Sequence, residues 1–398
     1  MILNFFVKEE GPEALLSVKC LFLLASCPAH LSHLLIEMES AVDILLSFHN
    51  QFVGDFRSRY GKGPHYSTAV YRHVMKAGKT FLDTLDVVAG KKDLIASLLA
   101  DLDFSPIRLV KQMSDQGVIK FISRLADGLD IESVIIPMHR RKTLCVSSQV
   151  GCRMGCRFCR TGKMGLIRNL TAAEIVSQVF VARHQIGSKI RNVVFMGMGE
   201  PLDNWDNVVQ AIRVMSDQRG LDISPRHITL STAGLTGGIN RLAQFDDPSV
   251  NLAVSLNAPN DDIRSLIMPI NRAMPMASLR QSLMQFPLSR KSAIFIEYVL
   301  IKGINDRREH ARALARFLAP INAVKVNLIP YNPEPGSEFN PPSAEAYEQF
   351  HAWLVAEKVF VRRRSEKGAR IMAACGQLGL PIRPPDMPLR GNGDPKES

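Results

Sequence analysis

The chain has 398 residues, which is long enough for one large catalytic domain and a smaller accessory domain. Hydrophobic residues make up 46% of the sequence and charged residues 22%, a globular composition that excludes a disordered, fibrous or collagen-like protein. Lysine and arginine outnumber aspartate and glutamate by 49 to 38, so the net charge is +11. This excess is consistent with solubility alone but slightly favours a polyanionic partner such as nucleic acid.

No run of about 18 apolar residues occurs, so we predict no transmembrane helix. Residues 15–27 (LLSVKCLFLLASC) resemble the apolar core of a short signal peptide. However, Glu9, Glu10 and Glu13 stand where a signal peptide carries positive charge, and Lys19 interrupts the apolar run. We therefore interpret residues 1–37 as an atypical N-terminal extension and expect a cytoplasmic protein.

Between residues 38 and 118 the apolar positions recur at helical spacing, as in AVDILLSFHNQFV, STAVYRHVMKAG and KKDLIASLLADL. We predict a small helical accessory domain there. Its basic residues, which include Arg72, Lys76 and Lys79, fit RNA binding and an ordinary solvated surface equally well. The next segment, GVIKFISRLADGLDIESVIIP, has two apolar, β-branched runs around a polar turn, which predicts a β-hairpin between the two domains.

The segment from residue 119 to 378 alternates strand-like runs with helical patterns. Such alternation predicts an α/β core of parallel β/α units, arranged as an open sheet or a partly closed barrel. Thr171 and Glu174 are spaced as a capping box, so a helix should begin between them. Residues 379–398 are rich in proline and glycine and are predicted to be disordered. The six predicted strands are TLCVSSQV, NVVFMGMGEP, HITLSTAG, NLAVSLNA, FIEYVLI and KVNLIPYNP.

Polar residues and glycines recur where these strands stop. Ligands bind at the carboxyl ends of the strands in parallel β/α folds, so we expect these residues to line one mouth of the core. They are Gly199, Glu200, Ser231, Ser255, Leu256, Asn257 and Asn332.

Four of the seven cysteines, Cys145, Cys152, Cys156 and Cys159, lie within fifteen residues. An odd total and this clustering favour reduced thiols that hold a metal over a secreted disulfide framework. The C-x3-C-x2-C run from Cys152 to Cys159 is typical of three thiolate ligands of a 4Fe-4S cluster whose fourth iron stays open. An open iron can chelate S-adenosylmethionine. Structural zinc is the alternative, but it usually needs a second nearby pair of ligands, which this sequence lacks.

The cysteine run, followed by Gly-Met-Gly-Glu-Pro at 197–201, resembles the radical-SAM superfamily. Further segments narrow the resemblance to the RlmN/Cfr family of radical-SAM RNA methyltransferases, from about residue 60 to 378: TLCVSSQVGC, FMGMGEPLDNWDNV, ITLSTAG, AVSLNAPND, NLIPYNPEPG and AACGQL. The resemblance implies a partial (βα)6 TIM-like barrel, one 4Fe-4S cluster, S-adenosylmethionine, and ribosomal or transfer RNA as substrate. It also implies an electron donor such as flavodoxin or ferredoxin, and we expect a monomer.

By resemblance, the reaction places a methyl group on a ring carbon of adenosine. Carbon 2 is our first choice of target, and carbon 8 is the alternative that the same cysteines would serve. Cys375 would become an S-methylcysteine intermediate, Cys145 would resolve it through a transient disulfide, and Glu132 would accept a proton. Without the resemblance, Cys145 would be interpreted as a buried strand residue and Glu132 as an exposed strand carboxylate.

The resemblance also assigns the cluster to Cys152, Cys156 and Cys159, and the S-adenosylmethionine contacts to the seven strand-end residues given above. Two departures from the family pattern leave substrate identity open. Asn257 stands where family members commonly carry histidine, and Arg370 stands where an acidic residue is common.

Basic residues surround the predicted catalytic elements, and we expect them to neutralise RNA phosphates there. Two other functions stay open: a radical-SAM enzyme acting on a non-RNA substrate, and a non-catalytic RNA-binding iron–sulfur protein, which would not need Cys375. The basic residues are Arg140, Arg141 and Lys142 before Cys145, Arg153, Arg157 and Arg160 around the cluster, and Arg362, Arg363 and Arg364 before Cys375.

Overall fold

The structure is a computed structural model that describes residues 42–103, 107–138, 141–245, 250–290, 292–334, 336–364 and 367–379. The predicted N-terminal extension, Arg140 and all of the predicted tail except Gly379 therefore lie outside the described residues. Among the described helices, none combines the length and the apolar character needed to cross a lipid bilayer.

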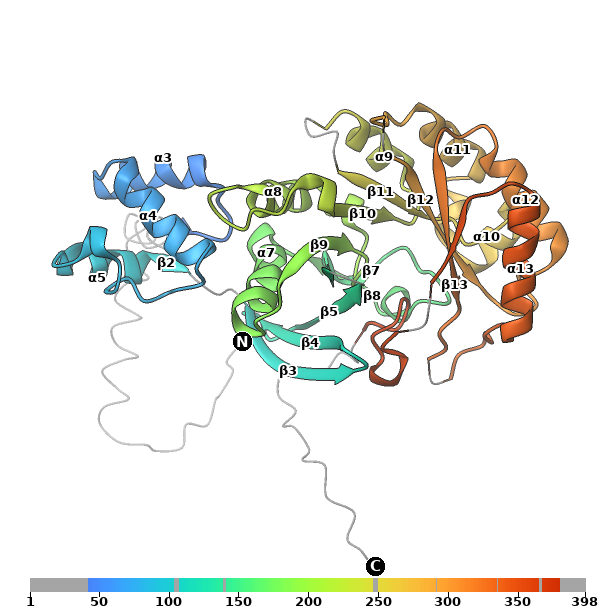
Figure 1. Cartoon of the computed structure of the whole chain (residues 1–398), viewed down its shortest axis with the longest axis horizontal. Helices are drawn as coiled ribbons and strands as arrows, with labels where there is room; N and C mark the ends of the chain where they lie inside the picture. The colour runs from blue at the N-terminus through green and yellow to red at the C-terminus, as the bar shows by residue number, and fades with distance from the viewer. Residues whose placement is uncertain are drawn as a thin grey trace, which may run out of the picture.

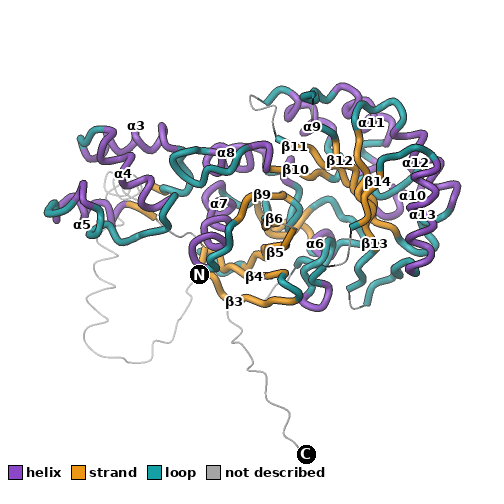
Figure 2. Tube along the Cα trace, in the orientation of Figure 1, coloured by secondary structure: helices purple, strands orange, loops and turns teal. Residues whose placement is uncertain are grey.

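Ten strands form one sheet at the centre of the core (Figures 1 and 2). They are β3 (Ile107–Asp115), β4 (Val118–Leu125), β5 (Asp130–Met138), β6 (Arg141–Cys145), β9 (Ile190–Phe195), β10 (Ile228–Thr232), β11 (Asn251–Ser255), β12 (Ile294–Leu300), β13 (Val324–Pro330) and β14 (Val361–Arg363). Their order is β14-β13-β12-β11-β10-β9-β6-β5-β4-β3. Neighbours from β6 to β14 pair in parallel, whereas β3 to β6 pair antiparallel.

The parallel half of the sheet is the predicted partial barrel. The six predicted strands are confirmed as β6 and β9 to β13, and β14 adds a seventh parallel strand. Their apolar runs are nearly continuous because both faces of each strand are covered. The helices and turns of the core are α6 (Arg160–Lys163), α7 (Ala172–Phe180), η2 (Val181–Gln185), η3 (Pro201–Asp203), α8 (Trp205–Ser216), η4 (Pro225–His227), α9 (Thr236–Ala243), α10 (Asp261–Ile267), η5 (Pro269–Arg272), α11 (Met276–Gln285), α12 (Arg308–Leu318), α13 (Ala344–Ala356) and η6 (Ala369–Ile371).

Two local predictions are confirmed. The Thr171 hydroxyl accepts a hydrogen bond from the Glu174 N–H (3.2 Å), and the Glu174 carboxylate accepts one from the Thr171 N–H (2.8 Å), so α7 begins with a complete capping box. The predicted hairpin is formed by β4 and β5, which pair antiparallel.

The accessory region contains α3 (His49–Tyr60), α4 (Pro64–Met75), η1 (Asp86–Val88) and α5 (Lys92–Asp101), with a short parallel pair of β1 (Val42–Asp43) and β2 (Leu102–Asp103). The helical prediction is wrong for its last part, because residues 107–115 form β3. In β3, exposed residues alternate with more buried ones over much of its length, and the strand pairs with β4 at the edge of the sheet. The accessory helices lie beside α7 and α8 (Figure 1).

Two small apolar clusters beside the main core position the functional segments. One packs Cys152, Met154 and Phe158 against Ile267 and Met268. The other packs Cys145 and Met198 against Ala373 and Leu378, so it connects the end of β6 to the C-terminal segment. Both clusters lie at the carboxyl ends of the parallel strands.

Candidate active site

The three clustered cysteines lie on one loop. This loop joins β7 (Gln149–Cys152) to α6 and β8 (Gly165–Asn169), and β7 pairs antiparallel with β8. The Arg157 N–H donates to the Ile267 carbonyl (3.0 Å) and holds the loop against α10. Gly162 packs so closely that a Cβ there would lie 2.9 Å from the Cys156 backbone nitrogen and oxygen. The loop therefore keeps its shape through packing of its own backbone.

The donor set fits an iron–sulfur cluster. Cys152, Cys156 and Cys159 line the same cavity, and burial raises the pKa of each thiol. For Cys156, the other two cysteines raise the pKa further. Within the described residues, no three His, Cys, Asp or Glu side chains converge to hold a single metal ion. A 4Fe-4S cluster does not require convergence, because each cysteine binds a different iron, whereas a zinc site does.

Five of the seven strand-end residues line this same cavity: Gly199, Glu200, Ser231, Ser255 and Asn257. The other two lie elsewhere. The Leu256 side chain is fully buried in the main core, so it could reach a ligand in this cavity only through its backbone. Asn332 lines a second cavity, described below.

Glu200 connects the ends of two neighbouring strands. Its carboxylate accepts hydrogen bonds from the Leu202 N–H (3.1 Å) and the Ala233 N–H (2.6 Å). Burial raises the pKa of Glu200 to about 7, and the hydrogen bonds only partly offset this rise. Each carboxylate oxygen can accept a second hydrogen bond, so a ligand in the cavity can still use Glu200.

The sequence reasoning missed the role of the polar residues that follow β6. The Ser147 hydroxyl donates to the Glu132 carbonyl (2.7 Å) and accepts from the Met198 N–H (2.9 Å). The Gln149 side-chain oxygen accepts from the Glu200 N–H (2.9 Å). These bonds join the start of the cysteine loop to the loop after β9. The run of polar residues at the end of a buried strand was the signal that could have predicted this link.

Asn257 adopts a left-handed backbone conformation with φ of 55°, which asparagine tolerates better than most residues. Its side-chain oxygen accepts from the Val299 N–H (2.9 Å), and its side-chain nitrogen contacts the Met268 sulfur (3.4 Å). The Asn257 amide therefore helps to shape the cavity wall.

Cys375 lies on the C-terminal segment, exposed at the boundary between the cysteine cavity and the second cavity. Several hydrogen bonds fix this segment. The Arg160 N–H donates to the Gly376 carbonyl (2.8 Å), and the Thr161 hydroxyl donates to the Leu378 carbonyl (2.5 Å). The Lys120 ammonium donates to the Met372 carbonyl (2.9 Å). The segment is thus docked on the cysteine loop and on β4.

Glu132 lies on β5 and is only 1% exposed, so the interpretation as an exposed carboxylate is wrong. It forms an ion pair with Lys120 (2.6 Å) and accepts from the Gly379 N–H (2.6 Å). Glu132 lines neither the cysteine cavity nor the second cavity. In this arrangement its carboxylate holds the C-terminal segment.

Cys145 ends β6 and is buried against the same C-terminal segment. Burial raises its pKa, and the neighbouring Cys375 raises it further. Both residues are free thiols in this structure. The fold therefore places two cysteines that are far apart in sequence on facing segments.

The second cavity adjoins the first, and both are lined by Cys375 and Glu297. Its other lining residues include Asn332 and the basic side chains Arg363, Arg364 and Lys367. Glu297 accepts from the Asn327 side-chain nitrogen (2.7 Å), and burial raises its pKa. The sequence reasoning missed Glu297, although a single acid within the apolar run FIEYVLI was a usable signal.

Arg264 is a further residue that the sequence reasoning missed. Its guanidinium is fully buried and donates to the carbonyls of Ala233 (2.6 Å), Ser255 (3.2 Å) and Leu256 (3.2 Å). Burial lowers its pKa to about 10, while Cys156 acts in the opposite direction. Arg264 therefore places a positive charge behind the strand ends, near the cysteine loop.

The predicted basic residues do not all surround the mouth. Arg153 pairs with Asp203 (2.8 Å), Arg157 with Glu338, and Arg363 with Glu348 (2.7 Å). Arg141 begins β6, so it lies at the opposite end of the strand from Cys145. The expectation that Arg141 flanks the catalytic mouth is wrong, because an extended strand separates the two residues. Arg370 is exposed and makes no polar side-chain contact with other described residues.

Comparisons with known proteins agree with this geometry. The family model described as "Radical SAM superfamily" matches residues 146–317. A probable dual-specificity RNA methyltransferase RlmN from Protochlamydia amoebophila is 42% identical over 85% of this chain and 94% of its own length. A dual-specificity RNA methyltransferase RlmN from Geobacter sulfurreducens is 45% identical over 80% of this chain and 87% of its own length.

A crystal structure of a radical SAM methyltransferase from Sphaerobacter thermophilus superimposes with a TM-score of 0.79 and 36% identity. The match covers 85% of this chain and 99% of that one, and it confirms the partial-barrel fold. The chain belongs to the radical-SAM superfamily and, within it, to the RlmN family of RNA methyltransferases.

Proposed function

We propose that the protein is a radical S-adenosylmethionine-dependent methyltransferase that methylates carbon 2 of an adenosine in ribosomal or transfer RNA. The observation that carries this proposal is the position of Cys375, an exposed thiol at the boundary between the cysteine cavity and a basic cavity. A group on Cys375 could face a cofactor on one side and a nucleic acid on the other. The relatives carry the RlmN name rather than the Cfr name, which favours carbon 2 over carbon 8.

Cys152, Cys156 and Cys159 would hold one 4Fe-4S cluster. When bound, such a cluster supplies the single electron that cleaves S-adenosylmethionine to a 5′-deoxyadenosyl radical. We assign the methionine and nucleoside contacts to the strand-end residues Gly199, Glu200, Ser231, Ser255 and Asn257, with Leu256 contributing its backbone. Asn332 would contact S-adenosylmethionine from the side of the second cavity. Short polar groups and an acid that can accept from the methionine ammonium suit this ligand.

Cys375 would act first as a nucleophile. Its thiolate attacks the methyl carbon of S-adenosylmethionine, so a sulfur–carbon bond forms while the sulfonium–methyl bond breaks. After transfer to adenine, the one-carbon unit is a methylene that still links the RNA to Cys375. The Cys145 thiolate then attacks the Cys375 sulfur, so a disulfide forms while the bond between that sulfur and the methylene carbon breaks. The carbon keeps the electron pair and takes up a proton, and the methylated RNA is released. Burial beside the same segment supports the assignment of Cys145, since no other described thiol belongs to that apolar cluster.

Glu132 would accept the proton from the adenine carbon. Its ion pair with Lys120 (2.6 Å) fixes the position of the carboxylate that would act as the base. Release of the Gly379 N–H would free one carboxylate oxygen for this role. The proton acceptor and the anchor of the C-terminal segment would then be one residue.

The RNA would approach through the second cavity, where Arg364 and Lys367 can neutralise phosphates next to the target. The adenine must leave its stack to reach Cys375, as in other enzymes that modify a base. We further propose that the enzyme works as a monomer in the cytoplasm and takes its electron from flavodoxin or ferredoxin.

The test is anaerobic. The protein is reconstituted with iron and sulfide, supplied with reductant and S-adenosylmethionine, and incubated with unmodified transcripts of ribosomal and transfer RNA. We expect 2-methyladenosine in the mass spectrum of the digested RNA. Formation of 8-methyladenosine would move the target to carbon 8, and 5′-deoxyadenosine with neither nucleoside would favour a non-RNA substrate.

Two variants separate the roles of the thiols. We expect Cys375→Ala to abolish the methylated nucleoside while the iron content and RNA affinity stay unchanged, because only the methyl carrier is lost. This retention of binding with loss of product also excludes a non-catalytic RNA-binding protein. We expect Cys145→Ala to accumulate RNA attached covalently to Cys375, visible as a shifted band on a denaturing gel. A Cys145→Ala protein that turns over normally would contradict the resolving role.

A further inference from the structure

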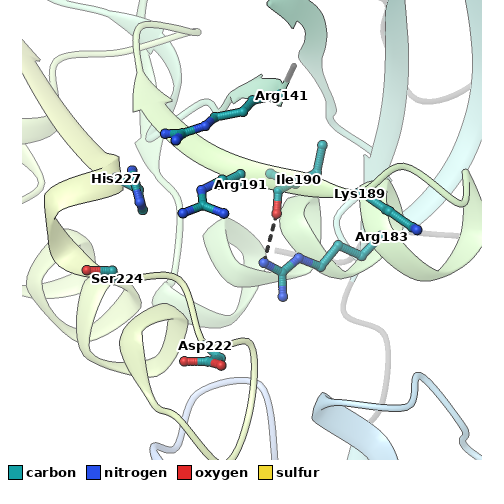
Figure 3. A pocket seen from close by; sticks show the side chains of 8 residues that line it. All are labelled: Arg141, Arg183, Lys189, Ile190, Arg191, Asp222, Ser224 and His227. Atoms are coloured by element: carbon teal, nitrogen blue, oxygen red, sulfur yellow. Dashed lines mark hydrogen bonds between the residues drawn. The ribbon is translucent and has the colours of Figure 1, made fainter.

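A charged pocket that is distinct from both cavities described above lies far from the catalytic mouth, at the amino ends of three neighbouring parallel strands (Figure 3). Arg141 begins β6, Ile190 begins β9, and His227 directly precedes β10. The mouth lies at the carboxyl ends of the same strands. A five-residue strand at about 3.3 Å per residue spans about 17 Å, so the pocket and the mouth are separate sites.

Positive charge dominates this pocket, which we call the amino-end pocket. Arg141, Arg183, Lys189 and Arg191 line it, together with a single carboxylate, Asp222. Within the part of the chain that the structure describes, the Arg141, Lys189 and Arg191 side chains have no ion pair or hydrogen bond. These cations are therefore available to an anion from outside the chain.

The pKa of His227, the histidine of the pocket, is consistent with this excess of positive charge. Burial lowers the pKa of His227, and the nearby Arg191, Arg141 and Arg226 lower it further. The local potential is thus positive enough to disfavour a further proton, which is the environment that a bound anion would relieve.

The frame of the pocket is well fixed. The Arg183 guanidinium donates to the Ile190 carbonyl (3.0 Å), as Figure 3 shows. It also donates to the Leu221 carbonyl, so its plane is held in place. The next residue, His184, contacts the Met75 carbonyl of α4 through its ring nitrogen (3.3 Å). The loop before β10 is also braced, because the Asp217 carboxylate accepts from the His49 N–H of α3 (2.7 Å). The amino-end pocket therefore forms where the accessory helices meet the barrel.

We propose that the amino-end pocket binds a backbone phosphate of the substrate RNA, at a distance from the nucleotide that is methylated. The inference rests on the proposed function, in which the substrate is RNA. Guanidinium groups can each donate two parallel hydrogen bonds to phosphate oxygens, and two unpaired ones converge here. Apart from the His227 imidazole, the lining residues offer no aromatic ring on which a base could stack. Such a contact positions the RNA without reading its sequence.

The test compares two double variants that remove the same charge. Arg141→Ala with Arg191→Ala removes the two unpaired arginines of the amino-end pocket, while Arg308→Ala with Arg316→Ala removes two exposed arginines from α12 on the outer face of the barrel. Binding of unmodified ribosomal and transfer RNA transcripts is measured over a range of salt concentrations. We expect roughly tenfold or greater loss of affinity for the pocket variant, and a salt dependence reduced by about one to two in its logarithmic slope. The control should remain close to wild type.

Equal affinities of the pocket variant and the control would overturn the proposal. A second arm uses inorganic phosphate and thermal unfolding. If phosphate stabilises the wild type but not the pocket variant while RNA affinities stay equal, the pocket serves a free phosphate compound and the RNA assignment is overturned. Methylation by the wild type reports the proposed function separately, since its absence leaves the binding comparison intact. Circular dichroism and binding of S-adenosylmethionine confirm that both variants fold.

Discussion

The two ends of strands β6, β9 and β10 differ in the environment of their charged groups. Near the carboxyl ends, two carboxylates are buried and held by partners: Glu132 of β5 pairs with Lys120 of β4, and Glu200 accepts two backbone hydrogen bonds. At the amino ends, Arg141 and Arg191 are exposed and have no partner among the described residues. Burial shifts pKa values and excludes water, which chemistry needs, whereas exposed cations keep their charge for binding. The strands thus separate the site of reaction from a site of attachment.

The largest effect is expected at the buried ion pair. Lys120→Met leaves the Glu132 carboxylate buried without its counter-charge and removes the donor to the Met372 carbonyl. Breaking a buried pair in this way costs about 3–5 kcal/mol, so the free energy of unfolding in urea should fall by about this amount. Methylation should fall as well, because the segment that carries Cys375 loses an anchor.

Two controls keep this prediction specific. Lys111→Met removes a lysine from the exposed edge strand β3 and should change the free energy of unfolding by less than about 0.5 kcal/mol. Adding Glu132→Leu to Lys120→Met should recover much of the lost stability, since no unpaired charge remains. The amino-end pocket should keep its response to phosphate throughout. A loss of that response would show that the two ends of the strands do not act independently.

An intermediate effect is expected at Glu200. Glu200→Gln removes the charge that would accept from the methionine ammonium, so affinity for S-adenosylmethionine should fall about 10- to 100-fold. Because burial raises the pKa of Glu200 to about 7, wild-type affinity should increase as the pH rises through 7, and the variant should lose this dependence. Calorimetry with Asp206→Asn, an exposed carboxylate on α8, provides the control. Equal pH profiles for wild type and Glu200→Gln would contradict the assignment.

The raised pKa of Glu200 also makes the stability of the folded protein depend on pH. The folded state holds the Glu200 proton up to about pH 7, whereas the unfolded chain releases it near the ordinary value of 4.5. Between these values the folded state binds more protons, so the contribution of Glu200 to stability declines as the pH rises from 4.5 to 7. A bound ammonium would reverse this trend by favouring the carboxylate.

Much of the core could be predicted because its signals are local. The capping box at Thr171, the hairpin around residues 126–129 and the cysteine run depend on residues close in sequence, so the pattern itself carries the geometry. Strand-end residues were also predictable, since parallel strands bring their carboxyl ends to one edge. Residues 107–115 were misinterpreted because a half-exposed edge strand has no long apolar run to distinguish it from a helix.

The remaining features depend on contacts between distant segments. Arg264, in the segment NDDIRSLI, has the pattern of a surface helix residue, and only the fold shows that its guanidinium is buried beneath three carbonyls. Arg141 precedes Cys145 by four positions, yet the extended strand carries it to the opposite end of the sheet. The docking of the C-terminal segment through Lys120 and Glu132 joins residues about 250 apart, which no local pattern encodes.

The smallest effect is expected at Glu297. It tests whether a carboxylate at the catalytic mouth changes the pKa of the Cys375 thiol. Desolvation of the sulfur raises the pKa of the Cys375 thiol, and the Glu297 carboxylate raises it further, so Glu297→Gln should lower that pKa and increase the thiolate fraction at a fixed pH near 8. Iodoacetamide should then label Cys375 a few-fold faster, and the pH–rate profile should move to lower pH. Glu345→Gln, an exposed carboxylate at the start of α13, should leave the profile unchanged. An unshifted profile in Glu297→Gln would mean that solvent screens this carboxylate, and the difference between the two ends would then rest on the ion pair and Glu200 alone.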